Sequence, residues 1–249
     1  MNSSLSSASE YRPKTFKDMI GQDAIVKTLS NAIKNDNIPQ ALLFCGPRGV
    51  GKTSCARILA KKINNLEENF EYNIFELDAA SNNSVEDIRT ITDQIRIPPQ
   101  VGNYKVYIID EVHMLSNQAF NAFLKSLEEP PKHVVFILAT TEKNKIIPTI
   151  LSRCQIYDFK KVDNTSITKL LSNICEDKKI KYDENSLSLI ADKSDGSIRD
   201  SLSIFDRLVS FTDSNLNIEN VTLNLNILDY DSYFEISSYI LEKNINGIL

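Results

Sequence analysis

Short runs of apolar residues alternate along this chain with longer stretches in which apolar residues recur every three or four positions. Continuous short runs are typical of buried strands, and the longer spacing is typical of amphipathic helices. Strands are expected at 41–45, 74–77, 105–109, 134–139 and 155–159, with helices over about 23–34 and 53–63 and after residues 84 and 116. Strands that alternate with helices predict an α/β fold built on a parallel sheet.

Polar residues mark the expected helix starts, and prolines mark the helix ends. Ser84 is expected to cap a helix, because Asp87 follows three residues later and a periodic apolar face comes after it. Ser116 is expected to cap the next helix, and the proline pairs at 98–99 and 130–131 end the two helices.

The pattern changes after residue 160. Helical periodicity recurs at 167–175, 187–191 and 198–209 with no clear strand between, which predicts a small three-helix domain entered near Val162. Nearer the two ends, residues 9–16 are expected to be extended because Pro13 disfavours a helix, and residues 230–241 are expected to be helical.

The sequence Gly-Pro-Arg-Gly-Val-Gly-Lys-Thr at residues 46–53 fits the phosphate-binding loop pattern G-x-x-x-x-G-K-[ST]. A strand leads into it and a helix leaves it, so backbone N–H groups and the positive helix end can surround a polyphosphate. Lys52 is expected to reach the β- and γ-phosphates, and the Thr53 hydroxyl to hold Mg²⁺. The loop therefore predicts a bound nucleoside triphosphate, with contacts from Gly46, Pro47, Arg48, Gly49, Val50, Gly51, Lys52, Thr53 and Ser54.

The expected strand at 105–109 runs straight into two carboxylates, Asp110 and Glu111. In a sheet that carries such a loop, this strand end lies beside the phosphates. Asp110 is expected to complete the Mg²⁺ shell together with Thr53, and Glu111 to orient or deprotonate an attacking water. These residues add hydrolysis of the nucleotide to its binding.

Composition excludes several classes. The chain has 249 residues, 42% of them hydrophobic, with a net charge of −5, which fits one or two domains and argues against broad coating of nucleic acid. The four cysteines lack metal-ligand spacing, which predicts reduced thiols and no zinc. No apolar run approaches the roughly 20 residues of a membrane span, and the serine-rich start is not a signal peptide, so we expect a soluble cytoplasmic protein.

Several motifs resemble the AAA+ core of clamp-loader subunits. They are Asp-Glu-Val-His-Met-Leu at 110–115, Leu-Glu-Glu-Pro-Pro at 127–131, Leu-Ala-Thr-Thr-Glu at 138–142 and Ser-Arg-Cys at 152–154. Three more narrow the resemblance to the gamma/tau subunits of bacterial DNA polymerase III: Tyr-Arg-Pro at 11–13, Ile-Gly-Gln at 20–22 and Asp-Ala-Ala-Ser-Asn-Asn at 78–83. The similarity runs from residue 11 to the chain end. It implies a P-loop sheet with helices on both faces, then a helical lid.

This resemblance assigns roles to further residues. Thr141 would be the sensor-1 residue, with its hydroxyl near the γ-phosphate, and Thr140 is the alternative one residue earlier. Arg153 resembles the arginine finger that acts on nucleotide held by a neighbouring subunit. Arg199 matches sensor 2, which ties the lid to the γ-phosphate, with pairing to Asp200 or helix capping as its competing structural use.

The resemblance also implies contacts to the base and to DNA. The base and ribose would lie along Tyr11, Arg12 and Pro13, with Ile20 as an apolar wall. Helix starts that face the central chamber of a clamp loader approach the DNA backbone, which would implicate Asn82, Asn83 and Arg89. A solvated helix end is the competing interpretation of these three residues.

The chain departs from the gamma/tau pattern in three ways. The stretch at 64–69, where many members carry a four-cysteine zinc module, has no cysteine, so no zinc is expected. Ser9 and Glu10 stand where basic residues are usual, which puts nucleotide affinity in doubt. Only the beginning of the helical collar domain is present, so we divide the chain into a core (1–161), a lid (162–222) and a truncated collar (223–249).

The function implied by the resemblance is that of an ATP-hydrolysing clamp-loader subunit, which uses ATP to place a sliding clamp on primed DNA. Its partners would be further gamma/tau copies, delta and delta-prime subunits, the clamp and primer-template DNA. Nucleotidyl transfer would belong only to the polymerase holoenzyme. The alternatives are another AAA+ motor such as a branch-migration helicase, an archaeal-type clamp-loader small subunit, and a scaffold that holds ATP without turnover.

Overall fold

The computed structural model describes residues 6–65, 73–212 and 214–225, so the helix expected at 230–241 and nearly all of the expected collar lie outside the described residues. The chain divides into two units. We call the first the sheet unit; it comprises Ser9–Val162 together with Ser197–Arg199. The helical unit contains Asp163–Gly196 and the described residues of Met1–Ala8 and Asp200–Leu249.

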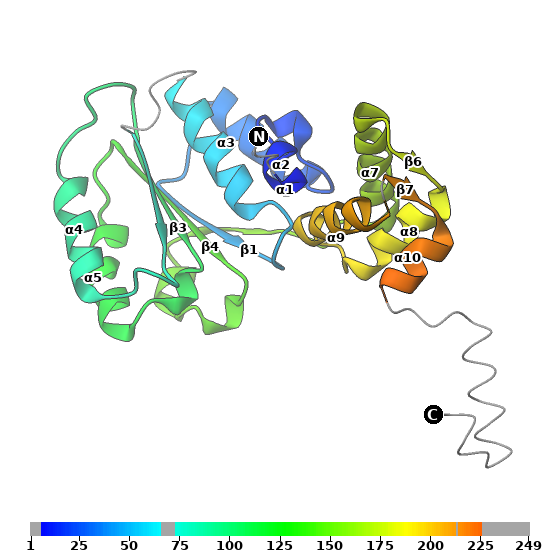
Figure 1. Cartoon of the computed structure of the whole chain (residues 1–249). Coiled ribbons are helices and arrows are strands. Elements are labelled where there is room, and N and C mark those ends of the chain that lie inside the picture. Colours follow the sequence, from blue (N-terminus) through cyan, green and yellow to red (C-terminus); the bar gives the residue numbers. More distant parts are fainter. Residues whose placement is uncertain (1–5, 66–72, 213, 226–249) are drawn as a thin grey trace, which may run out of the picture. The chain divides into compact units, whose positions relative to one another are not determined.

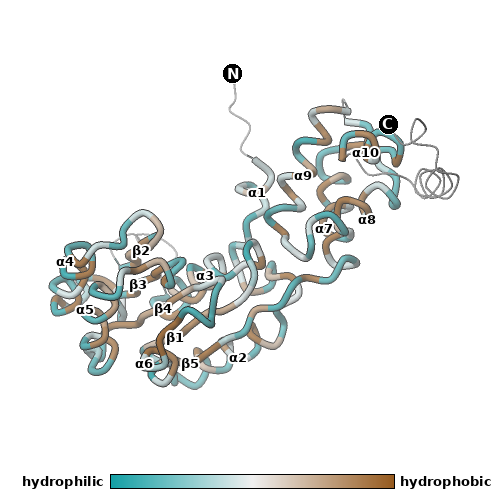
Figure 2. The backbone as a smooth tube through the Cα atoms, turned by 90° about the horizontal axis from the view of Figure 1, so that it is seen from below, coloured by the Kyte–Doolittle hydropathy of each residue, from teal (hydrophilic) through white to brown (hydrophobic). Residues whose placement is uncertain are grey.

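The sheet unit is built on five parallel strands in the order β2-β3-β4-β1-β5. The strands are β1 (Ala41–Cys45), β2 (Ile74–Asp78), β3 (Lys105–Asp110), β4 (Val134–Thr140) and β5 (Gln155–Asp158). All five lie where strands were predicted. Figure 2 shows β1 and β4 as hydrophobic along their length, as expected for strands that are covered on both faces.

Helices cover both faces of this sheet, which confirms the predicted α/β architecture (Figure 1). Strand residues alternate between two cores: Leu42 and Phe44 pack with α2 (Asp23–Lys34) and α3 (Lys52–Asn64). Leu43 belongs to the other core, with α4 (Val85–Ile95), α5 (Asn117–Glu128) and α6 (Pro148–Leu151).

The expectation that residues 9–16 are extended was wrong at both ends. A short helix, α1 (Ser7–Glu10), reaches into this range because a tertiary contact outweighs local preference: the Ser7 N–H donates to Asp206 at 2.8 Å. A 3₁₀ turn, η1 (Phe16–Asp18), begins at the other end, where the Thr15 N–H donates to the Asp18 carboxylate at 2.7 Å. That local bond competes with extended backbone.

The helical unit contains α7 (Asn164–Lys178), α8 (Glu184–Lys193), most of α9 (Ile198–Phe211) and α10 (Ile218–Asn224). The three predicted helices are confirmed, but the absence of strands was a wrong prediction. β6 (Lys181–Tyr182) pairs in parallel with β7 (Asn215–Leu216). Strands of two residues are too short to show the alternation by which a strand is recognised in a sequence.

The predicted caps of α4 and α5 are both present. The Ser84 hydroxyl accepts the Asp87 N–H at 3.2 Å, and the Asp87 carboxylate accepts the Ser84 N–H at 3.1 Å, which makes a reciprocal capping box. The Ser116 hydroxyl accepts the Ala119 N–H at 3.2 Å. These bonds fix where both helices begin, next to the strand ends that carry the chemistry.

Removal of the Ser84 cap should destabilise the sheet unit. We expect Ser84→Ala to lower its free energy of unfolding by about 1 kcal/mol, because the first turn of α4 loses a partner for an N–H group. Ser84→Thr keeps a hydroxyl acceptor and is the matched control. Urea unfolding followed by circular dichroism measures both variants, and equal stability of Ser84→Ala and the wild type would contradict the capping role.

Candidate nucleotide-binding and catalytic site

The loop between β1 and α3 depends on glycine where the backbone has no room for a side chain. Gly46 has φ of +148°, and a Cβ there would lie 2.4 Å from the carbonyl oxygen of Phe159. Gly51 has φ of +100° and directly precedes the first residue of α3. The loop therefore closes tightly against the start of the helix, whose free N–H groups favour an anion.

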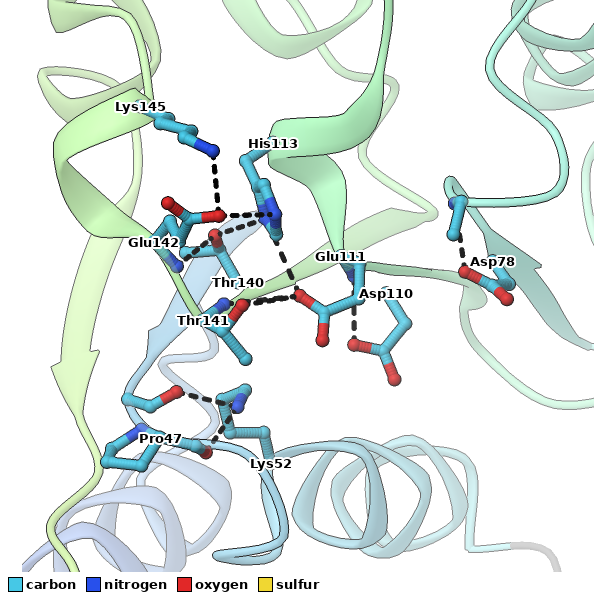
Figure 3. A network of polar contacts seen from close by, with 12 residues as sticks. Pro47, Lys52, Asp78, Asp110, Glu111, His113, Thr140, Thr141, Glu142 and Lys145 are labelled. Atoms are coloured by element: carbon cyan, nitrogen blue, oxygen red, sulfur yellow. Dashed lines mark hydrogen bonds and ion pairs between the residues drawn. The ribbon is translucent and has the colours of Figure 1, made fainter.

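The Lys52 side chain lies inside this loop. It is buried, and its ammonium donates to the carbonyl oxygens of Gly46 and Pro47, both at 2.7 Å (Figure 3). Burial lowers the pKa of Lys52, while the carboxylates of Glu111 and Asp110 oppose that shift. The two carbonyl partners are neutral, so the buried ammonium of Lys52 would be stabilised further by an anionic partner such as a phosphate.

Two oxygen atoms suited to a magnesium ion lie side by side at the start of α3. The Thr53 hydroxyl donates to Oδ2 of Asp110 at 2.5 Å, and the other oxygen of Asp110 accepts the Glu111 N–H at 2.9 Å. Hydroxyl and carboxylate oxygens are hard ligands of the kind that Mg²⁺ prefers. The residues present therefore fit the predicted metal.

The Glu111 side chain is fixed by the neighbouring strand end. Glu111 has φ of +47°, an unusual backbone conformation for a non-glycine residue, and it precedes the 3₁₀ turn η3 (Val112–Met114). Oε2 of Glu111 accepts the Thr141 hydroxyl at 3.0 Å and the Thr141 N–H at 3.3 Å (Figure 3). The carboxylate is thereby held beside the residue that follows β4.

The two threonines at the end of β4 face different surroundings. Thr140 is fully buried, and its hydroxyl accepts the Glu142 N–H at 3.0 Å and lies 3.0 Å from Nδ1 of His113. Thr141 is half-buried and directs its hydroxyl at Glu111. Of the two sensor-1 candidates, Thr141 is therefore the one that shares its surroundings with the expected base.

Two residues of this network received no role in the sequence analysis, although both stand in its motifs. The His113 side chain is only 6% exposed; Nδ1 lies 3.5 Å from Oε2 of Glu111, and Nε2 lies 3.3 Å from Oε1 of Glu142. Glu142 is itself paired with Lys145 at 2.8 Å. The sequence motif does not show which side chains are in contact, so the contacts of His113 and Glu142 could be found only from the fold.

Arg153 lies away from the loop, at the end of the sheet where the strands begin, whereas the loop lies at the end where they finish. Leu42 pairs with Gln155 and Cys45 with Asp158, so Arg153, just before β5, is level with the beginning of β1. The loop follows the end of β1, whose five residues at about 3.3 Å each put roughly 15 Å between the two edges. The structure does not bring Arg153 to the loop of its own chain.

Arg153 has a partner at that edge. Its guanidinium donates to the Glu128 carboxylate and to the Thr149 carbonyl oxygen, both at 2.8 Å. About a third of the Arg153 side chain is exposed, so a partially solvated ion pair holds it. Such pairs contribute little stability, so breaking this one costs little free energy.

The N-terminal segment meets the start of α3. Nε of Arg12 donates to the Ser54 hydroxyl at 3.2 Å, and the pKa of Arg12 is lowered mainly by burial and further by nearby Arg57. A cavity of about 420 Å³ opens beside this bond, with Arg12, Pro13 and Ser54 in its wall. No residue of 46–53 lines that cavity, so it is separate from the phosphate-binding loop.

For Tyr11, Ile20 and Arg199, the other residues predicted to contact the nucleotide, the structure gives fewer contacts with the loop. Tyr11 and Ile20 are both half-buried. Met19, next to Ile20, lies against the loop, since a Cβ on Gly51 would come within 2.9 Å of it. Residues 197–199 belong to the sheet unit, in which the Arg199 N–H donates to the Gly49 carbonyl oxygen at 3.4 Å.

The three residues suggested for DNA lie beyond β2 and on α4. The backbone N–H and the side-chain amide of Asn82 both donate to the Asp78 carbonyl oxygen, at 2.9 and 3.2 Å. The Asn83 carbonyl accepts the Ser116 N–H at 3.4 Å, and Arg89 is exposed on α4. Asn82 and Asn83 thus have structural partners in the turn, and their contact with DNA stays a prediction.

Within residues 6–65, 73–212 and 214–225, no group of three or more His, Cys, Asp or Glu side chains is placed to hold a metal ion. In the same part of the chain, no helix is both long and apolar enough to cross a membrane.

A loop of the P-loop type after β1, paired carboxylates at the end of β3 and a separate helical unit together define an AAA+-type ATPase. Solved structures share this fold: the *Thermotoga maritima* RuvB Holliday junction branch migration motor has a TM-score of 0.70 over 92% of this chain and 79% of its own. At 19% identity the likeness concerns the fold alone.

Sequence comparison identifies the family. The family described as "DNA polymerase III, delta subunit" matches residues 21–163, and "DNA polymerase III clamp loader subunit, ATPase lid domain" matches residues 166–214. DNA polymerase III subunit gamma of *Buchnera aphidicola* (subsp. *Baizongia pistaciae*) is 40% identical over 97% of this chain and 70% of its own length. The chain belongs to the gamma/tau family of bacterial DNA polymerase III clamp-loader ATPases.

Other relatives are longer. DNA polymerase III subunit tau of *Bacillus subtilis* is 41% identical over 96% of this chain, and that of *Escherichia coli* is 39% identical over 95%. The chain spans 46% of the first and 40% of the second. The similarity therefore concerns the ATPase part of these relatives.

Replacing each of Thr140 and Thr141 should separate their roles. We expect Thr141→Val to slow ATP hydrolysis about tenfold or more with little change in ATP affinity, because a polar contact near the reacting phosphate is lost. Thr140→Val should mainly lower the free energy of unfolding, by about 1–3 kcal/mol, because buried partners lose their bond. ATPase rates and thermal unfolding of both variants measure this, and the opposite pattern would make Thr140 the sensor.

Proposed function

We propose that this chain is the ATP-hydrolysing subunit of a bacterial clamp loader, which uses ATP binding and hydrolysis to load a sliding clamp on primed DNA. The observation that carries the proposal is that the expected catalytic residues of this chain do not all lie together. Thr53, Asp110 and Glu111 lie together at one edge of the sheet, while Arg153 lies at the opposite edge. Family membership supports the same function.

In this mechanism, the chain's own residues bind and orient the nucleotide. Backbone N–H groups of the loop and Lys52 bind the β- and γ-phosphates. Thr53 and Asp110 would hold Mg²⁺, which neutralises phosphate charge when bound. Glu111 accepts a proton from water as the water oxygen bonds to the γ-phosphorus; the β–γ phosphoanhydride breaks, and ADP and inorganic phosphate leave.

Arg153 completes the site of a neighbouring subunit in this proposal. Released from Glu128, its guanidinium neutralises charge that grows on the γ-phosphoryl group in the transition state. Arg199, near the start of α9, contacts the same phosphate as sensor 2, and Thr141 is sensor 1. The base and ribose lie against Tyr11, Arg12, Pro13 and Ile20.

The proposal also covers the assembly. We divide the chain into core (1–161), lid (162–222) and collar (223–249). Its proposed partners are further gamma/tau copies, delta, delta-prime, the clamp and primer-template DNA. Its proposed location is the cytoplasm. ATP bridges two subunits, so its state sets their relative angle and thereby opens or closes the ring. Asn82, Asn83 and Arg89 are the proposed DNA contacts.

The test measures ATP hydrolysis and clamp loading with the full set of loader subunits, clamp and primed DNA. We expect the mixture to hydrolyse ATP far faster than the chain alone. Glu111→Gln should slow hydrolysis about a hundredfold or more, and Arg153→Ala about a thousandfold or more per shared site, both with ATP still bound.

Arg96→Ala is the matched control, because Arg96 is an exposed arginine of the same unit, at the end of α4, with no role in the proposed site. We expect it to keep the wild-type rate. If the wild-type mixture is no faster than Glu111→Gln, the chain is a nucleotide-holding scaffold. A rate that is indifferent to Arg153→Ala would remove the shared site from the mechanism.

A further inference from the structure

We propose that His113 is a positioning residue that holds the Glu111 carboxylate in place for proton transfer and links it to Glu142. The inference rests on the proposed function, because it takes Glu111 as the base. It adds to that function a residue whose side chain is directed at the base rather than at the nucleotide.

Contacts on both edges of the ring carry the inference (Figure 3). Nδ1 of His113 lies 3.0 Å from the Thr140 hydroxyl and 3.5 Å from Oε2 of Glu111, the oxygen that Thr141 also holds. Nε2 lies 3.3 Å from Oε1 of Glu142. One imidazole therefore lies between two carboxylates from different segments of the chain.

The His113 ring can donate from only one of its two nitrogen atoms when it is neutral. A neutral imidazole has one N–H, so it donates either on the Nδ1 side, toward Thr140 and Glu111, or on the Nε2 side, toward Glu142. Two further groups act on the same carboxylates: Lys145 pairs with Glu142, and Asp110 is the neighbour of Glu111 along the chain. The direction of the ring proton therefore decides which carboxylate is held.

Burial makes this arrangement specific. The ring is only 6% exposed, so its nitrogen atoms depend on these partners rather than on water. A carboxylate displaced by about 1 Å from its productive position can cost about a hundredfold in rate. The contact on the Glu111 side is therefore expected to matter for turnover, and the Glu142 side for holding the ring.

Two substitutions of His113 test the contacts of its two ring nitrogen atoms separately. In His113→Asn the amide takes the place of Nδ1 and keeps a donor toward Glu111 and Thr140. In His113→Gln the amide takes the place of Nε2 and keeps only the contact toward Glu142. His133→Gln is the matched control, because the chain has two histidines and Nε2 of His133 bonds to the Ile95 carbonyl oxygen at 3.0 Å, outside this network.

The experiment measures kcat and KM for ATP in the assembled loader with clamp and primed DNA, and thermal unfolding of each variant. We expect His113→Gln to lower kcat about tenfold or more with KM within about twofold, because the base is misplaced while ATP binding is untouched. His113→Asn should stay within about threefold of the wild-type kcat, and His133→Gln should match the wild type.

Equal kcat for wild type, His113→Asn and His113→Gln overturns the proposal, as does an equal loss in both variants that tracks a lower unfolding temperature. Glu111→Gln in the same assay separates this from failure of the proposed function. If Glu111→Gln is inactive while both His113 variants are fully active, only the positioning role fails. If Glu111→Gln is fully active, the assignment of the base itself fails.

Discussion

Parallel pairing of β1, β3 and β4 is the constraint on which the rest of this structure depends. Because the three strands run in the same direction and in register, their carboxyl ends meet at one edge of the sheet. The phosphate-binding loop, the pair Asp110–Glu111 and the pair Thr140–Thr141 each lie at one of these ends. The 2.5 Å bond between Thr53 and Asp110 is the direct result.

The same parallel arrangement keeps Arg153 away from the loop of its own chain. Arg153 precedes β5, whereas the loop follows β1, and these strands are adjacent and parallel. A residue before one strand and a residue after its parallel neighbour lie at opposite edges. In the proposed mechanism, a second subunit would therefore be needed to bring Arg153 to a phosphate-binding loop.

Sequence patterns predicted most of this fold because both faces of the central strands β1, β3 and β4 are buried. Strands covered on both faces are continuous apolar runs, and Ser84 and Ser116 mark the starts of their helices, so these elements were recognisable. The short pair β6 and β7 was not, because two residues carry no periodicity. α1 depends on a bond between Ser7 and Asp206, a contact over long sequence distance that local preference does not contain.

The site was predictable in its residue types but not in its contacts. The resemblance favoured Thr141 as the sensor-1 residue and left Thr140 as the alternative, and their contacts distinguish them: Thr140 is buried beside His113, whereas the Thr141 hydroxyl donates to Glu111. The partner of Arg153, Glu128, and the position of His113 between Glu111 and Glu142 likewise depend on how distant segments pack.

The central claim is that one subunit holds ATP while the next supplies the arginine. Mixing two defective variants in the assembled loader tests it most directly: Lys52→Ala, which cannot hold the phosphates, and Arg153→Ala, which lacks the finger. The account predicts that each alone is inactive and that the mixture regains ATP hydrolysis, because Arg153 of one variant meets the intact loop of the other. A mixture as inactive as the separate variants would contradict it.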